Sequence, residues 1–333
     1  MKPRLGSGTL GLACAVFAGV SLTWWYQQHV PAFVMSPTQP ALRDVLTPQS
    51  APKSFAPEIL GALSADASAE QLVERIHGLS ENLPEAGQKV LLDWIQQPRP
   101  AHIAASKWHW VINEVMGALR IQKAPHPGLA TTLIAISRNQ ANGVVLRDYA
   151  LQHLAHWILP GRPAEPRDKN ARQEIVTAFM DAAREVEQTF SGTALRSLHV
   201  VLAHRGKDDA SFSNSFNEPA LITVETIRPL AIDLATSAST NPVARITALQ
   251  VCSELRFVEV LPAARRFASG EDAPISVRLS AIALLGAIGE AEDTAILSAI
   301  STKRYARLEK ARTPALSRIR ARVQSKATTL SVK

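Results

Sequence analysis

The chain has 333 residues, 46% of them hydrophobic, and carries a formal net charge of +7. That length and apolar content fit a globular protein with a large core, and the two cysteines, Cys14 and Cys252, are too few for a disulfide framework. The positive charge gathers at the C-terminus, whereas residues 5–302 are mildly acidic. The basic composition therefore does not by itself indicate nucleic-acid binding.

Residues 1–30 have the pattern of an export signal. Lys2 and Arg4 precede an uncharged run over residues 5–25, which as a helix would be about 31 Å long and able to span a bilayer. Basic residues stay on the cytoplasmic side, so we expect a single-pass anchor with the rest of the chain outside the cytoplasm, in the periplasm if the cell is bacterial. A cleaved signal peptide and a buried helix of a cytosolic protein are the alternatives.

Residues 31–57 follow with six prolines among Ser, Thr, Gln and Ala. Such a composition cannot pack a core and favours extended conformations. We interpret this segment as a linker that spaces the body from the membrane.

Residues 58–302 are predicted to form an all-α domain, because apolar residues recur at i, i+3, i+4 and i+7. Prolines separate the expected helices. Asn142, Asn241 and Asp272 stand just before three of them, where an N-cap residue is expected. Helices are expected over residues 68–81, 85–97, 103–122, 127–139, 144–158, 169–189, 193–204, 219–237, 242–256, 258–269, 275–289 and 292–301, followed by a basic pair within 303–326.

An arginine recurs at the same point of three of these helices, followed three residues later by an alanine and then by a large aliphatic residue. The positions are Arg147 and Ala150, Arg245 and Ala248, and Arg278 and Ala281. Arg245 and Arg278 are 33 residues apart, and Arg147 precedes Arg245 by 98, close to three such periods. A fixed period in this range predicts stacked helical hairpins, in which the arginines have a structural role.

The segment from Asp272 to Gly289, with Val277-Arg278 and an alanine- and leucine-rich stripe, resembles the second helix of a HEAT repeat. The segments 241–255 and 142–157 are similar to it but match less closely. The resemblance implies a right-handed α-α superhelix of about six helix pairs. It also implies a protein-binding scaffold whose ligand lies on the concave face lined by the arginine helices, with the arginines bonded to turns of neighbouring repeats.

Trp108, His109 and Trp110 are the strongest candidates for contact with a partner in the body. Adjacent residues on a helix point about 100° apart, so the two tryptophans cannot share one narrow stripe. We expect one of them in the core and the other near an interface.

His153 and His156 are three residues apart, which places both imidazoles near one face of a helix. Two imidazoles on one face could be the first two ligands of a metal site. The sequence suggests no third ligand, and Leu151, Leu154 and Ile158 mark a buried stripe that the histidines would flank. A metal- or small-ligand-binding enzyme module remains the alternative at this helix or near the tryptophans.

Residues 303–333 are predicted to form a basic helical cap and tail. Nine Lys or Arg stand in 303–326 against the single acid Glu309, and they alternate with apolar residues that would cover the last repeat. Arg304 and Arg307 would alternatively contact an acidic partner or anionic lipid headgroups.

The chain has no Gly-rich phosphate loop, no Gly-x-Ser-x-Gly and no cysteine–histidine nucleophile pattern. We therefore expect a membrane-anchored, extracytoplasmic scaffold that binds another protein without catalysis. No cofactor, metal or nucleic acid is expected.

Overall fold

The computed structural model describes residues 66–158, 169–205, 222–301 and 305–331, together with Gly61 and Leu63. The chain divides into two units, residues 1–51 and 52–333, and every described residue belongs to the second. The expected anchor and the whole proline-rich linker, residues 31–57, lie outside the described residues. Within the described ranges every regular element is helical, which confirms the all-α prediction, and none of these helices is long and apolar enough to cross a bilayer.

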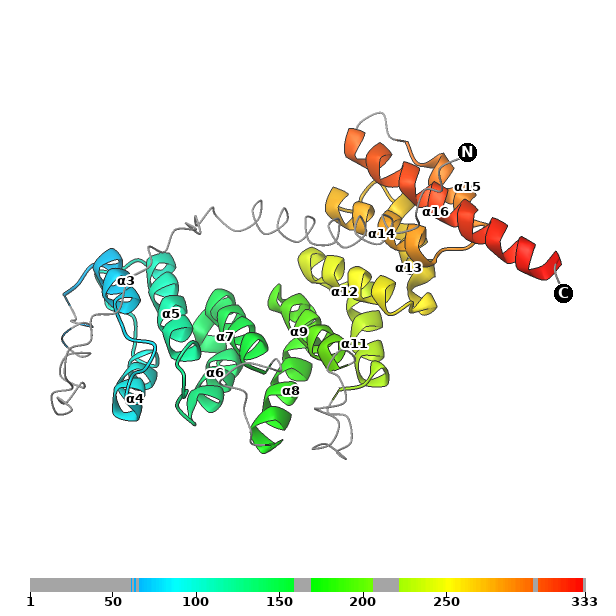
Figure 1. Cartoon of the computed structure of the whole chain (residues 1–333). Helices are drawn as coiled ribbons and strands as arrows, with labels where there is room; N and C mark the ends of the chain where they lie inside the picture. Colours follow the sequence, from blue (N-terminus) through cyan, green and yellow to red (C-terminus); the bar gives the residue numbers. More distant parts are fainter. Residues whose placement is uncertain are drawn as a thin grey trace, which may run out of the picture. The chain divides into compact units, whose positions relative to one another are not determined.

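Figure 1 shows the helices in chain order. They are α3 (Ala69–His77), α4 (Glu85–Trp94), α5 (Ala105–Arg120), α6 (Leu129–Arg138), α7 (Gly143–Ile158), α8 (Lys169–Arg184), α9 (Phe190–Arg205), α11 (Val224–Thr236), α12 (Pro242–Glu254), α13 (Leu261–Ser269), α14 (Ile275–Ile288), α15 (Asp293–Ala299) and α16 (Ala306–Ser331). Two short 3-10 helices, η1 (Gln140–Asn142) and η2 (Val258–Val260), precede α7 and α13.

The cap of α12 is the predicted one, whereas that of α14 is not. Asn241 accepts a hydrogen bond at its Oδ1 from the backbone N–H of Val243, at 2.9 Å, and so satisfies one of the free donors of the first turn. At α14 the residue before the helix is Pro274, and no side chain, including that of Asp272, caps the first turn.

The expected cap of α7 is also corrected. Asn142 lies in η1, and its side-chain amide donates to the carbonyl of Ile136 at 3.1 Å instead of accepting from the first turn of α7. The chain enters α7 at Gly143 with φ at +68°, a conformation that glycine adopts without the steric cost of a Cβ. Glycine, rather than asparagine, is what this turn requires.

The helices of the second unit form two sets that alternate along the chain. The first set, which we call the arginine row, consists of α3, α5, α7, α9, α12, α14 and α16, each in contact with the next. The second set, the companion row, packs on it in pairs: α4 with α5, α6 with α7, α8 with α9, α11 with α12, α13 with α14 and α15 with α16. Each pair buries apolar surface against its neighbours as well as within itself.

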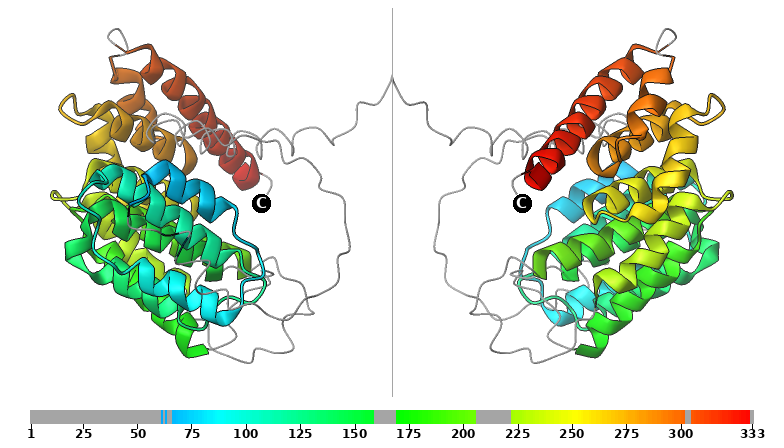
Figure 2. Two further views of the ribbon diagram at one scale, coloured as in Figure 1. Left: turned by 90° about the vertical axis from the view of Figure 1, so that its left-hand side faces the viewer. Right: turned by 90° about the vertical axis from the view of Figure 1, so that its right-hand side faces the viewer.

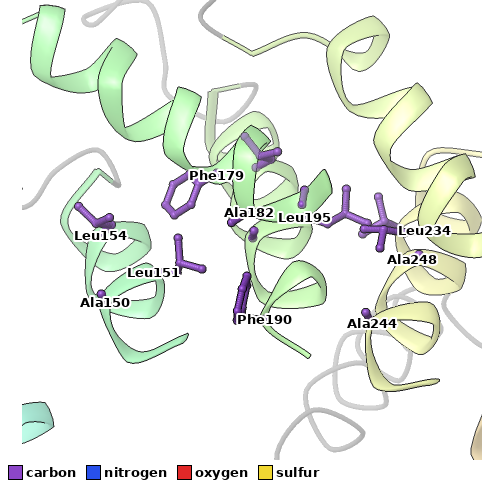
Figure 3. Packing of buried hydrophobic residues seen from close by; sticks show 14 of the residues in the cluster. Ala150, Leu151, Leu154, Phe179, Ala182, Phe190, Leu195, Leu234, Ala244 and Ala248 are labelled. Atoms are coloured by element: carbon purple, nitrogen blue, oxygen red, sulfur yellow. The ribbon is translucent and has the colours of Figure 1, made fainter. Parts of the chain in front are cut away.

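The core runs between these pairs without interruption. In Figure 3, Leu151 and Leu154 of α7 lie near Phe179 of α8 and Phe190 of α9, and all four are completely buried. Burying side chains of this size stabilises the fold by about 1.5–3 kcal/mol each relative to exposure. The α8–α9 pair therefore supplies cover that α7 lacks by itself.

Glycines let the helices of the arginine row approach closely. A Cβ on Gly192 of α9 would lie 2.9 Å from the Cα of Ala244 in α12, and one on Gly286 of α14 would lie 2.8 Å from the Cα and Cβ of Ala315 in α16. Both distances are shorter than ordinary carbon contacts. Small residues at these two interfaces thus set the helix separation.

The basic C-terminal segment contains one helix where a pair was expected. α16 runs unbroken through Pro314, although proline removes a helical hydrogen bond and crowds the preceding turn. Leu308, Ala315 and Ile319 are buried on the side of α16 that packs on α14 and α15. Tertiary burial on both sides of the proline outweighs its local cost.

Candidate functional site

Arg147 joins three helices in the interior of the protein. Its Nε donates to the carbonyl of Ser137, near the end of α6, at 2.6 Å, and a terminal nitrogen bonds the carboxylate of Glu185, just after α8. The guanidinium also lies 4.3 Å from the ring centroid of Phe190, the first residue of α9. Such a contact, together with bonds at the negative end of a helix, stabilises a buried cation.

Arg245 makes the same kind of contacts two pairs further along. It bonds the carbonyl of Ser237, which follows α11 directly, and donates more weakly to the carbonyl of Thr240 at 3.4 Å. Its guanidinium lies 4.6 Å from the ring centroid of Phe267 on α13. Burial, and to a smaller extent the nearby Arg266, lowers the pKa of Arg245 from its ordinary value.

A fourth arginine of this type, which the sequence pattern did not identify, is Arg312 of α16. It donates to the carbonyls of Ile300 at 3.0 Å and Ser298 at 3.4 Å, at the end of α15. Arg312 follows Arg278 by 34 residues, and an alanine stands three residues after it, at Ala315. This spacing was available in the sequence but was hidden within the basic tail, where Pro314 suggested a helix end.

Arg278 occupies the corresponding position of α14 and is also buried, with 6% of its surface exposed. Its Nε, like that of Arg245 and of Arg312, has no hydrogen-bond partner among the described residues, in contrast to the Nε of Arg147. Unlike those three arginines, Arg278 has no bond to a carbonyl of the preceding companion helix within the described ranges. The alanines three residues after the sequence-predicted arginines, at positions 150, 248 and 281, are completely buried. The structure therefore places the predicted repeat positions at equivalent points of their helices, with different bonding at Arg278.

The four arginine helices also share one accessible face. We call it the row face and define it by the positions two residues before and two, five and nine residues after each arginine, a spacing that follows one side of a helix. None of these residues is buried: Val145, Tyr149, Gln152, His156; Val243, Thr247, Gln250, Glu254; Ser276, Ser280, Ala283, Ala287; Lys310, Pro314, Ser317, Ala321. The row face is thus mostly small and polar, with few charges.

Polar side chains connect successive helices of the arginine row. His77 of α3 lies 2.9 Å from a carboxylate oxygen of Glu114 on α5, and Arg196 of α9 donates to Glu254 of α12 at 3.0 Å. His199 contacts the same Glu254 carboxylate at 3.4 Å, and burial lowers its pKa although Glu254 raises it. Arg196 thus pairs with the next helix of the arginine row, whereas Arg147 contacts both the preceding helix, at Ser137, and the following pair, at Glu185.

His153 lies between α5 and α7. Its Nε2 is 3.1 Å from the Oδ1 of Asn113, while its Nδ1 has no hydrogen-bond partner among the described residues. Burial, aided by the charge of Arg120, lowers the pKa of His153 to about 3, so the imidazole is neutral. His156 is exposed on the row face, and no group of three or more possible metal ligands occurs in the described ranges.

The tryptophan run is divided between core and surface. Trp108 is buried and packs on Trp94 of α4, with ring centroids 4.9 Å apart, so it offers no surface to a partner. His109 and Trp110 are half-buried, and the pKa of His109 is lowered by burial and then by Arg99. His109 and Trp110 are therefore the two residues of this run that remain candidates for contact with a partner.

The other singled-out residues are placed as follows. Arg307 is exposed on the first turn of α16, whereas Arg304 lies outside the described residues. Cys252 is completely buried, and burial raises the pKa of its thiol to about 12, which suits a core residue and not a reactive one.

Compared with protein-family models, with curated proteins and with solved structures, the chain gives no match. The functional argument therefore rests on the residues and contacts described above.

Proposed function

We propose that the chain is a right-handed HEAT-like α-solenoid of about six helix pairs. Its N-terminal segment anchors it in the membrane with the helical body outside the cytoplasm. The body binds a protein partner and does not catalyse a reaction. The observation that carries this proposal is the row face. Its sixteen positions, four on each of α7, α12, α14 and α16, stay accessible while the residues three and seven places after each arginine are buried. A repeated structural side and a variable accessible side are what a repeat scaffold uses to hold a partner.

The repeated back-bonding of arginines supports the solenoid part of the proposal. Arg147, Arg245 and Arg312 each bond carbonyls at the end of the helix that precedes their own. Such contacts tie α6 to α7, α11 to α12 and α15 to α16 in the same way.

Photo-crosslinking in intact cells tests partner binding. A photoreactive amino acid at Gln250 or Ala283 lies on the row face of neighbouring helices, and matched controls at Thr131 or Gln173 are exposed on companion helices. We expect the same protein to be recovered from both row-face positions and from neither control. Equal recovery from all four positions, or none from the row face, contradicts the proposal.

Two measurements test the remaining parts. Alkaline phosphatase fused after residue 57 is expected to be active, because that enzyme works only outside the cytoplasm; an inactive fusion contradicts the export prediction. Purified full-length protein is expected to hold no stoichiometric zinc. If the protein holds stoichiometric zinc and the His153→Ala variant loses it, the scaffold proposal is wrong and the chain is a metal-dependent module.

A further inference from the structure

Arg245 is half-buried and only partly bonded, whereas Arg147 is buried. Both hydrogen bonds of Arg245, to the carbonyls of Ser237 and Thr240, come from the same terminal nitrogen, Nη2. Its other terminal nitrogen, Nη1, makes no hydrogen bond with the described residues. Arg245 therefore keeps donors that a group from outside the chain could use.

A second arginine, Arg266 of α13, contacts the same aromatic ring. Its guanidinium carbon is 5.1 Å from the ring centroid of Phe267, and that of Arg245 is 4.6 Å from it, so the two carbons lie within about 10 Å of each other. A carboxylate bonded to a guanidinium brings their carbons to about 4 Å, so one carboxylate bonded by two guanidiniums spans about 8 Å. The two arginines are thus close enough to share one carboxylate.

Beside Arg147 the corresponding place is filled by a carboxylate of the chain itself. Glu185, the residue that directly follows α8, bonds the guanidinium of Arg147. The residue that directly follows α13 is Gly270, and a Cβ there would lie 2.9 Å from the carbonyl oxygen of Arg266. The position after α13 therefore accepts no side chain, and α12 has the arginine and the aromatic ring of this arrangement without its carboxylate.

No carboxylate of the described residues forms an ion pair with Arg245 or with the exposed Arg266. The acids that follow Arg266 most closely in the chain, Glu271 and Asp272, are exposed in the turn after α13 and are unpaired within the described ranges. All four residues belong to the continuously described range 222–301, and none of them has a hydrogen bond or ion pair outside it. The two positive charges are therefore not neutralised by the chain.

The next arginine of the series adds a third unpaired charge at the same edge of the unit. Figure 2 shows that the helices of the arginine row run in a common direction, so their first turns lie along one edge. Arg245 and Arg278 are each the fourth residue of their helices, and Arg266 lies in the last turn of α13, just before α14 begins. Arg278 is buried and pairs with no carboxylate in the part of the chain that the structure describes. This concentration of positive charge favours an anionic ligand.

We infer that Arg245 and Arg266 bind the carboxylate of an aspartate or glutamate side chain of a partner protein, in the place that Glu185 has beside Arg147. The carboxylate accepts hydrogen bonds from Nη1 of Arg245 and from the guanidinium of Arg266, while Nη2 of Arg245 keeps its bond to Ser237. Hydrogen bonds between two charged groups are stronger than those between neutral ones. This inference rests on the proposed scaffold function and names the chemistry of one contact with the partner.

Chemical labelling of arginines tests this site on the full-length chain in phosphatidylcholine nanodiscs. Phenylglyoxal modifies accessible guanidinium groups, and mass spectrometry gives the rate at each arginine. The probe is a capped peptide of glutamates, and the same peptide made of glutamines is the uncharged control. We expect the glutamate peptide at about 10 mM to slow the labelling of Arg266 and Arg245 about threefold, which corresponds to a dissociation constant of about 5 mM. The exposed Arg99 is the internal control and should be labelled at an unchanged rate.

A variant separates a site made of two arginines from attraction of the peptide to any cation. Arg266→Gln removes an exposed side chain and should abolish the protection of Arg245, whereas Lys123→Gln, an equal loss of charge at a distant exposed position, should leave it unchanged. Equal melting temperatures of the two variants show that folding is intact. The inference fails if the peptide does not protect Arg266 in the wild type, which leaves that residue as a solvated surface arginine. It also fails if Arg245 stays protected in Arg266→Gln.

The remaining outcomes are distinguished in the same preparation. If inorganic phosphate slows the labelling of Arg266 and the glutamate peptide does not, the site takes phosphate and the inference is wrong. Row-face crosslinks from Gln250 and Ala283 do not depend on Arg266. If these crosslinks form while the peptide gives no protection, the carboxylate site is wrong and the scaffold proposal stands. Protection by the peptide without row-face crosslinks keeps the carboxylate site and contradicts the scaffold proposal.

Discussion

A Cβ atom on Gly192 would lie 2.9 Å from the Cα of Ala244, so the backbones of α9 and α12 are in direct contact. Gly192→Ala gains about 1 kcal/mol of helix propensity but forces the two helices apart, at a cost of about 1–3 kcal/mol. We expect a net loss of stability of about 0–2 kcal/mol in urea unfolding, where Gly78→Ala should cause none. Gly78→Ala is the control, because its Cβ meets nothing closer than 3.4 Å; equal effects at both glycines contradict the close contact.

Arg147→Ala should destabilise the protein more than the loss of a surface arginine. The substitution removes the bond to Ser137 and leaves Glu185 without its buried cation, for which we expect about 2–3 kcal/mol. Arg138→Ala loses only an exposed ion pair with Asp181, worth about 0–1 kcal/mol. Chemical denaturation of both variants measures the difference in the free energy of unfolding. If Arg147→Ala loses no more stability than Arg138→Ala, the structural role of Arg147 is wrong.

Arg312→Ala should loosen α15 in particular. The carbonyls of Ser298 and Ile300 lose their donor, so we expect about 1–2 kcal/mol of local destabilisation and faster hydrogen exchange of α15. Arg318→Ala, on the same helix without such bonds, should leave the exchange unchanged. Exchange that is equally fast in both variants would show that α15 depends on total charge and not on Arg312.

Stability should fall as the pH drops below about 6.5, and His153 should be one cause. The folded-state pKa of His153 is about 3, below the ordinary histidine value of 6.5, so the unfolded chain binds more protons between these values. Between pH 6.5 and 5 this contributes a loss of up to about 2 kcal/mol.

His153→Gln keeps an amide donor for Asn113 and should flatten this part of the pH profile. His156→Gln, an exposed histidine one turn away on the same helix, is the matched control and should leave the slope unchanged. Urea unfolding of the three proteins at pH 7 and pH 5 provides the measurement. Identical slopes in the wild type and His153→Gln would show that the imidazole is not buried as described.

The sequence predicted the helices well and some of their ends poorly. Apolar spacing and prolines place most helices close to their observed ranges, because both act within a few residues. Asn142 failed as a cap because the choice between it and Gly143 depends on the turn around Ile136. Pro314 failed as a breaker because α14 and α15 hold both sides of α16 in place.

Some residues of the candidate surfaces could likewise be predicted from the sequence, and others could not. Arg147, Arg245 and Arg278 could be aligned from spacing alone, since a repeated position carries the same residue type at the same interval. Which tryptophan is buried depended on Trp94, fourteen residues before Trp108 in the chain, and nothing local to the run decides it.

The sequence by itself thus determined that the body is helical and that its helices recur with a common arginine and alanine, because these features follow from periodicity along the chain. Tertiary structure alone decided that Arg312 belongs to that series, and that Arg278 is buried without a carbonyl bond to the residues that the structure describes. Those outcomes depend on which helix lies beside which, and residues far apart in the chain determine that.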